Sequence, residues 1–141
     1  MADEAPIFKF DVCLYKNDSI STEDFTKYMR ETYLPKASAV VKKHGLLQFA
    51  VTLTPEGYRE PSRAFIKSQM KQGEWTVPDY DVVVSYWMYN PSDMGKVVAD
   101  PDWLELEKDA PAVTDQRVGH LVLGHQTVAF TSDAMPKPEL V

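Results

Sequence analysis

The sequence predicts a single α+β domain built on an antiparallel sheet, and three observations lead to this fold class. Four segments have the alternating or continuously apolar pattern of strands, and the segments between them carry apolar residues at helical spacing. The chain has 141 residues, which is near the commonest size of one domain. Hydrophobic residues make up 44% and charged residues 26%, the balance of a globular protein. We therefore expect one domain over residues 1–130 and a loose tail, rich in proline and charge, over residues 131–141.

The first strand and the first helix have clear local signals. Residues 7–15 alternate apolar and polar side chains, which predicts a strand with one strongly apolar face. Ser21 is followed three residues later by Asp24, which resembles a capping box, so we expect a helix to begin at Ser21. Pro35 lacks the amide hydrogen that an interior turn needs, so a kink is expected there. Gly45 is the expected cap at the end of this helix.

The rest of the chain predicts three more strands and three more helices. Residues 80–89 are apolar at both odd-numbered and even-numbered positions, which is typical of a central strand buried on both faces. Asp100 and Pro101 form an N-cap and first-turn pair that opens a helix. The other expected elements are a strand over 46–53, a loop over 54–61, a short helix over 62–71, a helix capped by Asn90 and Pro91 and running to Val98, and a strand over 120–130.

This order of elements predicts a ferredoxin-like β-α-β-β-α-β arrangement, with an insert between the second and third strands. The four-stranded antiparallel sheet is expected to carry the helices on one face. The other face has too many apolar side chains to lie in water, so we expect a homodimer that buries it sheet against sheet.

Charge and composition exclude several classes of partner. The 21 Asp and Glu residues exceed the 15 Lys and Arg residues and give a net charge of −6, which disfavours nucleic acid and membrane surfaces as partners. No apolar run approaches the ~20 residues that span a bilayer, and the acidic first residues do not resemble a signal peptide, so we expect a cytoplasmic protein. Cys13 is the single cysteine, so no internal disulfide forms, and no zinc-finger spacing is present.

Two stretches resemble a known family. The first helix contains Phe25, Tyr28, Arg30, Glu31 and Pro35, which fit the first-helix motif of EthD-like dimeric α+β barrel proteins, written F-x-x-Y-W-R-E-x-H-x-P. Residues 80–87 and 99–103 are similar to the second half of the fungal members, and the resemblance covers roughly residues 8–130. The chain departs from the motif at the tryptophan position, which is Met29, and at the histidine position, which is Tyr33.

The resemblance implies a dimeric α+β barrel enzyme of aromatic polyketide pathways in secondary metabolism. Members of this kind decarboxylate anthraquinone-type acids, and related barrels cyclise or dehydrate polyketide chains. The implied substrate is a small aromatic or polyketide compound, and no metal or organic cofactor is implied. Because Tyr33 replaces the family histidine, a proton-transfer role of that histidine does not carry over to this chain.

Three residues are the candidates for catalysis, because cofactor-free chemistry on a polyketide needs groups that move protons. His125 interrupts an apolar strand beside Gly124, where a ligand has room; a hydrogen-bonded core or interface histidine is the equal alternative. Tyr33 shares the helix stripe that faces the sheet, so its hydroxyl can donate to a substrate oxygen, or it is a core tyrosine. Asp11 is a carboxylate in an apolar strand that either orients a histidine or pairs with Lys9.

Six further residues are candidates for contact with the substrate. The aromatic ones are Tyr28, Trp87 and Trp103, which can stack on a planar ring or belong to the core. The others are Asp81, His44 and His120. Asp81 orients a histidine or marks a strand end, and His44 precedes Gly45, where an imidazole also suits the negative end of a helix. His120 points to the opposite sheet face from His125 if the strand is regular.

The sequence contains no nucleophile–base motif, phosphate-binding glycine loop or metal cluster. Glu105, Glu107, Lys108 and Asp109 read as a solvated helix face. The leading interpretation is a cofactor-independent acid–base enzyme that performs decarboxylation, cyclisation or dehydration. The alternative is a noncatalytic barrel that binds a hydrophobic aromatic ligand or an assembly partner, and a heme-binding barrel that uses a histidine is a third hypothesis.

Overall fold

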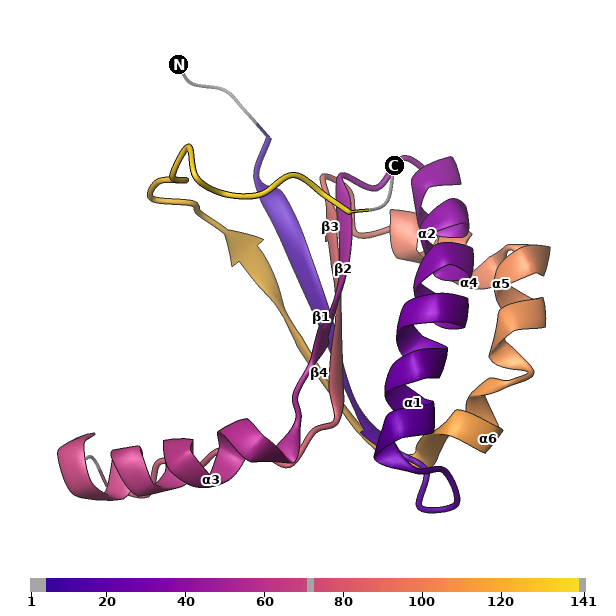
Figure 1. The fold of residues 1–141 in the computed structure, drawn as a ribbon. Coiled ribbons are helices and arrows are strands. Elements are labelled where there is room, and N and C mark those ends of the chain that lie inside the picture. The colour runs from indigo at the N-terminus through magenta and orange to yellow at the C-terminus, as the bar shows by residue number, and fades with distance from the viewer. Residues whose placement is uncertain (1–4, 71–72, 140–141) are drawn as a thin grey trace.

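The sheet has four antiparallel strands (Figure 1), in a computed structural model that describes residues 5–70 and 73–139. The strands are β1 (Ile7–Lys16), β2 (Gln48–Leu53), β3 (Val82–Met88) and β4 (Thr114–Gln126), in the spatial order β2-β3-β1-β4. Every neighbouring pair is antiparallel. This order confirms the ferredoxin-like arrangement, because the two central strands are the first and third in the sequence.

One long helical segment crosses the sheet and consists of α1 (Thr22–Tyr28), the π-helical turn η1 (Met29–Tyr33) and α2 (Leu34–Lys43). The Ser21 hydroxyl accepts the backbone N–H of Asp24 at 3.0 Å, which confirms the predicted N-cap. The disturbance expected at Pro35 takes the form of the π-helical turn just before it. Gly45 has a φ of 78°, so the predicted glycine cap is confirmed.

Three short helices complete the layer on the same face of the sheet: α4 (Asp93–Ala99), α5 (Pro101–Glu107) and α6 (Ala110–Val113). The predicted cap of α5 is confirmed, because the Asp100 carboxylate accepts the backbone N–H of Asp102 at 2.8 Å. The Asn90 side chain accepts the N–H of Ser92 at 3.0 Å in the turn before α4. Helix α6 has no counterpart among the predicted elements.

The expected loop over residues 54–61 is wrong, because a helix occupies most of it. Helix α3 (Glu56–Phe65) begins before Pro61, contains it, and continues as the π-helical segment η2 (Ile66–Met70). Proline removes the amide that would bind the Gly57 carbonyl, but both residues are exposed, so water can hydrate that carbonyl. Lys71, the last residue of the predicted short helix, lies outside the described residues.

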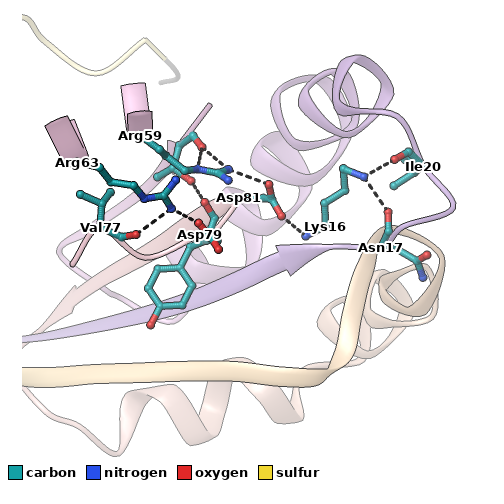
Figure 2. Close-up of polar contacts among 10 residues, drawn as sticks. Lys16, Asn17, Ile20, Arg59, Arg63, Val77, Asp79 and Asp81 are labelled. Carbon is teal, nitrogen blue, oxygen red and sulfur yellow. Dashed lines mark hydrogen bonds and ion pairs between the residues drawn. The ribbon is translucent and has the colours of Figure 1, made fainter. Parts of the chain in front are cut away.

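Helix α3 projects beyond the sheet as an arm with no buried residue, and arginines hold its base (Figures 1 and 2). The Arg59 guanidinium donates to the Thr54 carbonyl at 2.8 Å and pairs with Asp81 at 3.1 Å. Arg63 donates to the Val77 carbonyl at 3.1 Å and pairs with Asp79. These contacts fasten the outgoing helix to the segment that returns to β3.

Strand β4 begins and ends earlier than the predicted span of residues 120–130. It pairs with β1 from Gln126 back to Thr114, which lies opposite Lys16. The pairing is continuous over residues 119–126 and has an irregularity before Thr114, so the end of β1 extends its partner into polar residues that have no strand-like alternation. Residues 127–139 contain no helix or strand.

The main core lies between the sheet and its helix layer. The alternation in β1 is confirmed, since Phe8, Phe10, Val12 and Leu14 pack against this core. The buried core residues are Phe25, Met29, Ala37, Val40, Val41, Val82, Val84, Tyr86, Met88, Val97, Trp103, Leu106 and Val113. Among the described residues, no helix combines the length and apolar character needed to cross a membrane.

Candidate functional site

A pocket of about 410 Å³ opens between the sheet and the helix layer. This volume lies within the roughly 300–1,000 Å³ typical of small-molecule sites. Its walls are mostly apolar, and they come from strands β1, β3 and β4 and from all the helices of that layer except α2. The lining side chains that carry polar atoms are Tyr28, Tyr33, Tyr86, Trp103, Glu107, Thr114 and Gln116. The pocket is therefore suited to an apolar molecule with a few oxygen atoms.

Aromatic rings form the deep wall of the pocket. The Tyr33 ring lies 6.3 Å from Trp103, edge to face, and 6.4 Å from Phe49. The Tyr86 ring lies 5.2 Å from Phe49 and 6.3 Å from Phe10, measured between centroids. These spacings are those of favourable aromatic pairs, so the wall is a packed and pre-formed surface.

Three phenols in the pocket keep their protons beyond the usual tyrosine range. Burial raises the pKa of Tyr33 well above that range, although hydrogen bonding with Tyr86 partly opposes the shift. Burial and then the neighbouring Tyr33 phenol raise the pKa of Tyr86. Burial, Asp109 and Glu107 raise the pKa of Tyr28. The hydroxyls are therefore neutral donors at physiological pH.

Glu107 is the one carboxylate among the described residues that line the pocket. By its accessible surface it is an exposed residue, so it lies where the pocket opens to solvent. The surrounding protein still raises the pKa of its carboxyl group by desolvation, and hydrogen bonding with Trp103 opposes this in part. A carboxyl group with a raised pKa beside an apolar cavity is suited to accept and return a proton.

The sequence interpretation placed Glu107 on a solvated helix face and missed this position. Its spacing in the sequence could have indicated this position, because Glu107 follows Trp103 by one helical turn and shares its side of α5. Thr114 and Gln116 at the start of β4 were also missed. The Gln116 amide donates to the Thr114 hydroxyl, which donates to the Ala110 carbonyl at 3.0 Å.

Three of the nine predicted site residues line the pocket: Tyr28, Tyr33 and Trp103. His125 lies on the helix-facing side of the sheet, opposite Phe8 in the register with β1. Its ring contacts Phe8 edge to face at 5.9 Å between centroids. The side chain is exposed, and it is not part of the pocket wall.

Three predicted residues lie on the opposite face of the sheet. Asp11 pairs with Lys9 at 3.5 Å, and its other carboxylate oxygen is buried without a hydrogen-bond partner in the described structure. The Trp87 indole donates to Gln126 at 2.8 Å, and the Lys9 ammonium lies 5.0 Å from the ring centroid. His120 is opposite Cys13, as expected for the face away from His125, and is exposed.

The last two predicted residues hold structural junctions. His44 lies at the end of α2, and its ring nitrogen is 2.7 Å from the Asp100 carboxylate at the start of α5. Asp81 accepts the backbone N–H of Lys16 at 2.7 Å and pairs with Arg59, which joins the arm to the sheet (Figure 2). Over residues 5–70 and 73–139, no group of three or more His, Cys, Asp and Glu side chains is arranged to hold a metal ion.

Comparison with known proteins gives matches in sequence and in fold. The family model described as EthD domain matches residues 17–117. A curated relative, dehydratase iacD of Pestalotiopsis fici, is 27% identical over 124 residues, covering 86% of this chain and 87% of the relative. An EthD family protein from Bacillus halodurans C-125 superposes with a TM-score of 0.56 at 12% identity, covering 86% of this chain and 99% of that chain.

A second solved structure has a similar fold. It is a dimeric protein of unknown function from Bacteroides fragilis, described as having a ferredoxin-like fold. It superposes with a TM-score of 0.57 at 12% identity, covering 85% of this chain and 96% of that chain. At this identity the likeness concerns the fold, and it agrees with the strand order observed here.

Proposed function

This chain belongs to the EthD domain family, and on that basis we propose that it is a cofactor-independent acid–base enzyme that dehydrates a small aromatic or polyketide compound. Dehydration is chosen over decarboxylation and cyclisation because the curated relative is a dehydratase. The observation that carries the proposal is the convergence of Glu107 and three protonated phenols on one apolar pocket.

The proposed roles follow from the chemistry of a β-hydroxy ketone. A base removes a proton from the carbon beside the carbonyl, that electron pair forms the new double bond, and the C–O bond breaks. The departing oxygen takes up a proton and leaves as water. Glu107 accepts the carbon-bound proton and returns one to the leaving oxygen. The Tyr33 hydroxyl donates to the carbonyl oxygen, where negative charge develops, and its hydrogen bond with Tyr86 holds it in place.

The test is turnover of aromatic β-hydroxy ketones by the purified protein, with loss of one water followed by mass spectrometry. Glu107→Gln keeps the size of the side chain but removes the base, so turnover should fall by at least ~100-fold. Glu105→Gln is the matched control, because this exposed glutamate of the same helix pairs with Lys108 and does not line the pocket. Near-parental turnover by Glu107→Gln would show that another group moves the proton.

The noncatalytic hypothesis is supported by one departure from the family motif, the tyrosine at position 33 in place of histidine. It predicts that the parent protein binds these compounds in the pocket and returns them unchanged. Binding without any product across the ketone panel would favour this second function.

A further inference from the structure

The described walls of the pocket carry no positively charged side chain. The titratable groups that face the cavity are Tyr28 from α1, Tyr33 from η1, Tyr86 from β3 and Glu107 from α5. No Lys, Arg or His side chain lines it within the described part of the chain. Because the phenols remain neutral, Glu107 supplies the one charge that the described walls can carry, and this charge is negative.

We propose that this pocket binds its substrate as an uncharged molecule and rejects carboxylates of the same shape. The inference rests on the proposed function, since it concerns the same site. A carboxylate that enters must give up its hydration for aromatic and aliphatic walls, and no cation replaces the lost water. It also meets the ionised Glu107 across a cavity in which water screens the charges less than in bulk solvent.

The phenol hydroxyls do not remove this penalty. They can donate hydrogen bonds to a carboxylate, but they donate equally well to the oxygen of a ketone, an amide or a phenol. A neutral acceptor therefore gains the same donors without desolvating a charge.

A preference for uncharged substrates disfavours decarboxylation as the reaction. A carboxylic acid substrate, which decarboxylation requires, is ionised at neutral pH because its ordinary pKa is about 4. The pocket instead suits a reaction that begins with a neutral oxygenated compound, such as the removal of water from a hydroxy ketone.

The experiment compares two bicyclic aromatic ligands of nearly equal shape, a naphthalene carboxamide and the corresponding naphthalene carboxylate, by isothermal titration calorimetry at neutral pH. The carboxylate should bind at least ~10-fold more weakly, which corresponds to about 1.4 kcal/mol. Glu107→Gln should reduce this ratio by improving carboxylate binding alone, whereas Glu105→Gln should leave it unchanged. Lowering the pH should also reduce the ratio in the parent, as the ligand and Glu107 become protonated.

Equal or tighter binding of the carboxylate by the parent protein, or no binding of either ligand, would overturn the inference. The comparison uses the parent chain, so it does not depend on the folding of a variant. Its result can also be told apart from that of the proposed function. A pocket that prefers the amide but forms no product supports the preference for uncharged ligands and contradicts the enzyme. Turnover together with equal affinities supports the enzyme and contradicts the preference.

Discussion

Glu107 lies where the apolar pocket opens to solvent. Its carboxyl group is exposed enough to exchange protons with water, while the surrounding protein disfavours the charged form and raises its pKa. The three phenols of the pocket are held in the protonated form. The environment of each group therefore suits Glu107 to act as a base and the phenols to act as acids.

The pH dependence of kcat/KM should show the difference in pKa between Glu107 and the phenols. As pH rises, Glu107 loses its proton and becomes an active base, so activity should increase through a midpoint above the ordinary glutamate value of ~4.3. No fall is expected up to pH ~10, because the raised pKa of Tyr33 keeps this acid protonated. His125→Ala should leave the profile unchanged, since His125 lies outside the pocket. A titration step that disappears in His125→Ala would return the catalytic role to that histidine.

Tyr33→Phe tests the proposed donor to the carbonyl oxygen. The change removes one hydroxyl from the pocket without altering the aromatic wall, so kcat should fall by roughly 100-fold with a smaller change in KM. The variant should unfold somewhat more easily than the parent, because the buried Tyr86 hydroxyl loses its hydrogen bond with Tyr33. Tyr58→Phe on the exposed arm is the matched control and should have parental kinetics. Equal kinetics of Tyr33→Phe and Tyr58→Phe would contradict the role of Tyr33.

At the scale of elements, one carboxylate connects two helices. Asp100 caps α5 and lies 2.5 Å from the Lys43 ammonium and 2.7 Å from the His44 ring nitrogen at the end of α2. Hydrogen bonding with Lys43 and then with His44 holds the pKa of Asp100 well below its usual range. This junction fixes the start of the helix that carries Trp103 and Glu107.

Asp100→Ala should lower the thermal unfolding midpoint by about 3–6 °C, because it removes the cap and leaves His44 without its partner. Asp100→Asn should cost less, since an amide oxygen can still accept the N–H of Asp102. The lowered pKa means that the ionic contribution is present above the ordinary aspartate range and is lost as pH falls below it, so parent and Asp100→Asn should converge in acid.

Calorimetry or circular dichroism at several pH values measures these differences. Asp102→Ala is the control, because its pair with Lys43 is exposed and 3.8 Å long. If Asp100→Ala and Asp102→Ala melt together at neutral pH, Asp100 does not hold this junction.

At the scale of the whole molecule, the helix layer of the described structure packs on one face of the sheet. Strand β4 leaves Leu121 and Leu123 exposed on one face and Val122 exposed on the other. The uncovered face also contains Trp87 and the buried Asp11 oxygen that has no partner in the described structure. We propose that a second copy of the chain covers this face, because in an isologous contact the same patch of each copy buries that of the other.

Light scattering at micromolar concentration should therefore give about twice the chain mass of 16.0 kDa. Val122→Lys should shift the protein toward the monomer, because the new charge would be buried in the contact. Leu104→Lys changes a similarly exposed residue in the helix layer and should leave the mass unchanged. A parent protein of 16.0 kDa alone would contradict the homodimer.

The order of the elements could be predicted because the relevant signals are local. The alternation around Phe8 and Val12 marks the buried face of β1, and the side chains of Ser21 and Asp100 bind amides two or three residues away. Helix α3 and the length of β4 could not be predicted this way. Pro61 is tolerated because its surroundings are exposed, and β4 extends because β1 is available to pair with it.

For the pocket, the sequence by itself predicted Tyr28 and Tyr33 from the apolar stripe of the first helix, and Trp103 from its capacity to stack on a planar ring. Only the tertiary structure brought Glu107, Tyr86 and Thr114 to the same cavity and placed His125 and Asp11 outside it. The physical reason is that periodicity tells which face of an element is buried. Which side chains meet there depends on packing between strands and helices that lie far apart in the chain, and this packing exists only in the folded protein.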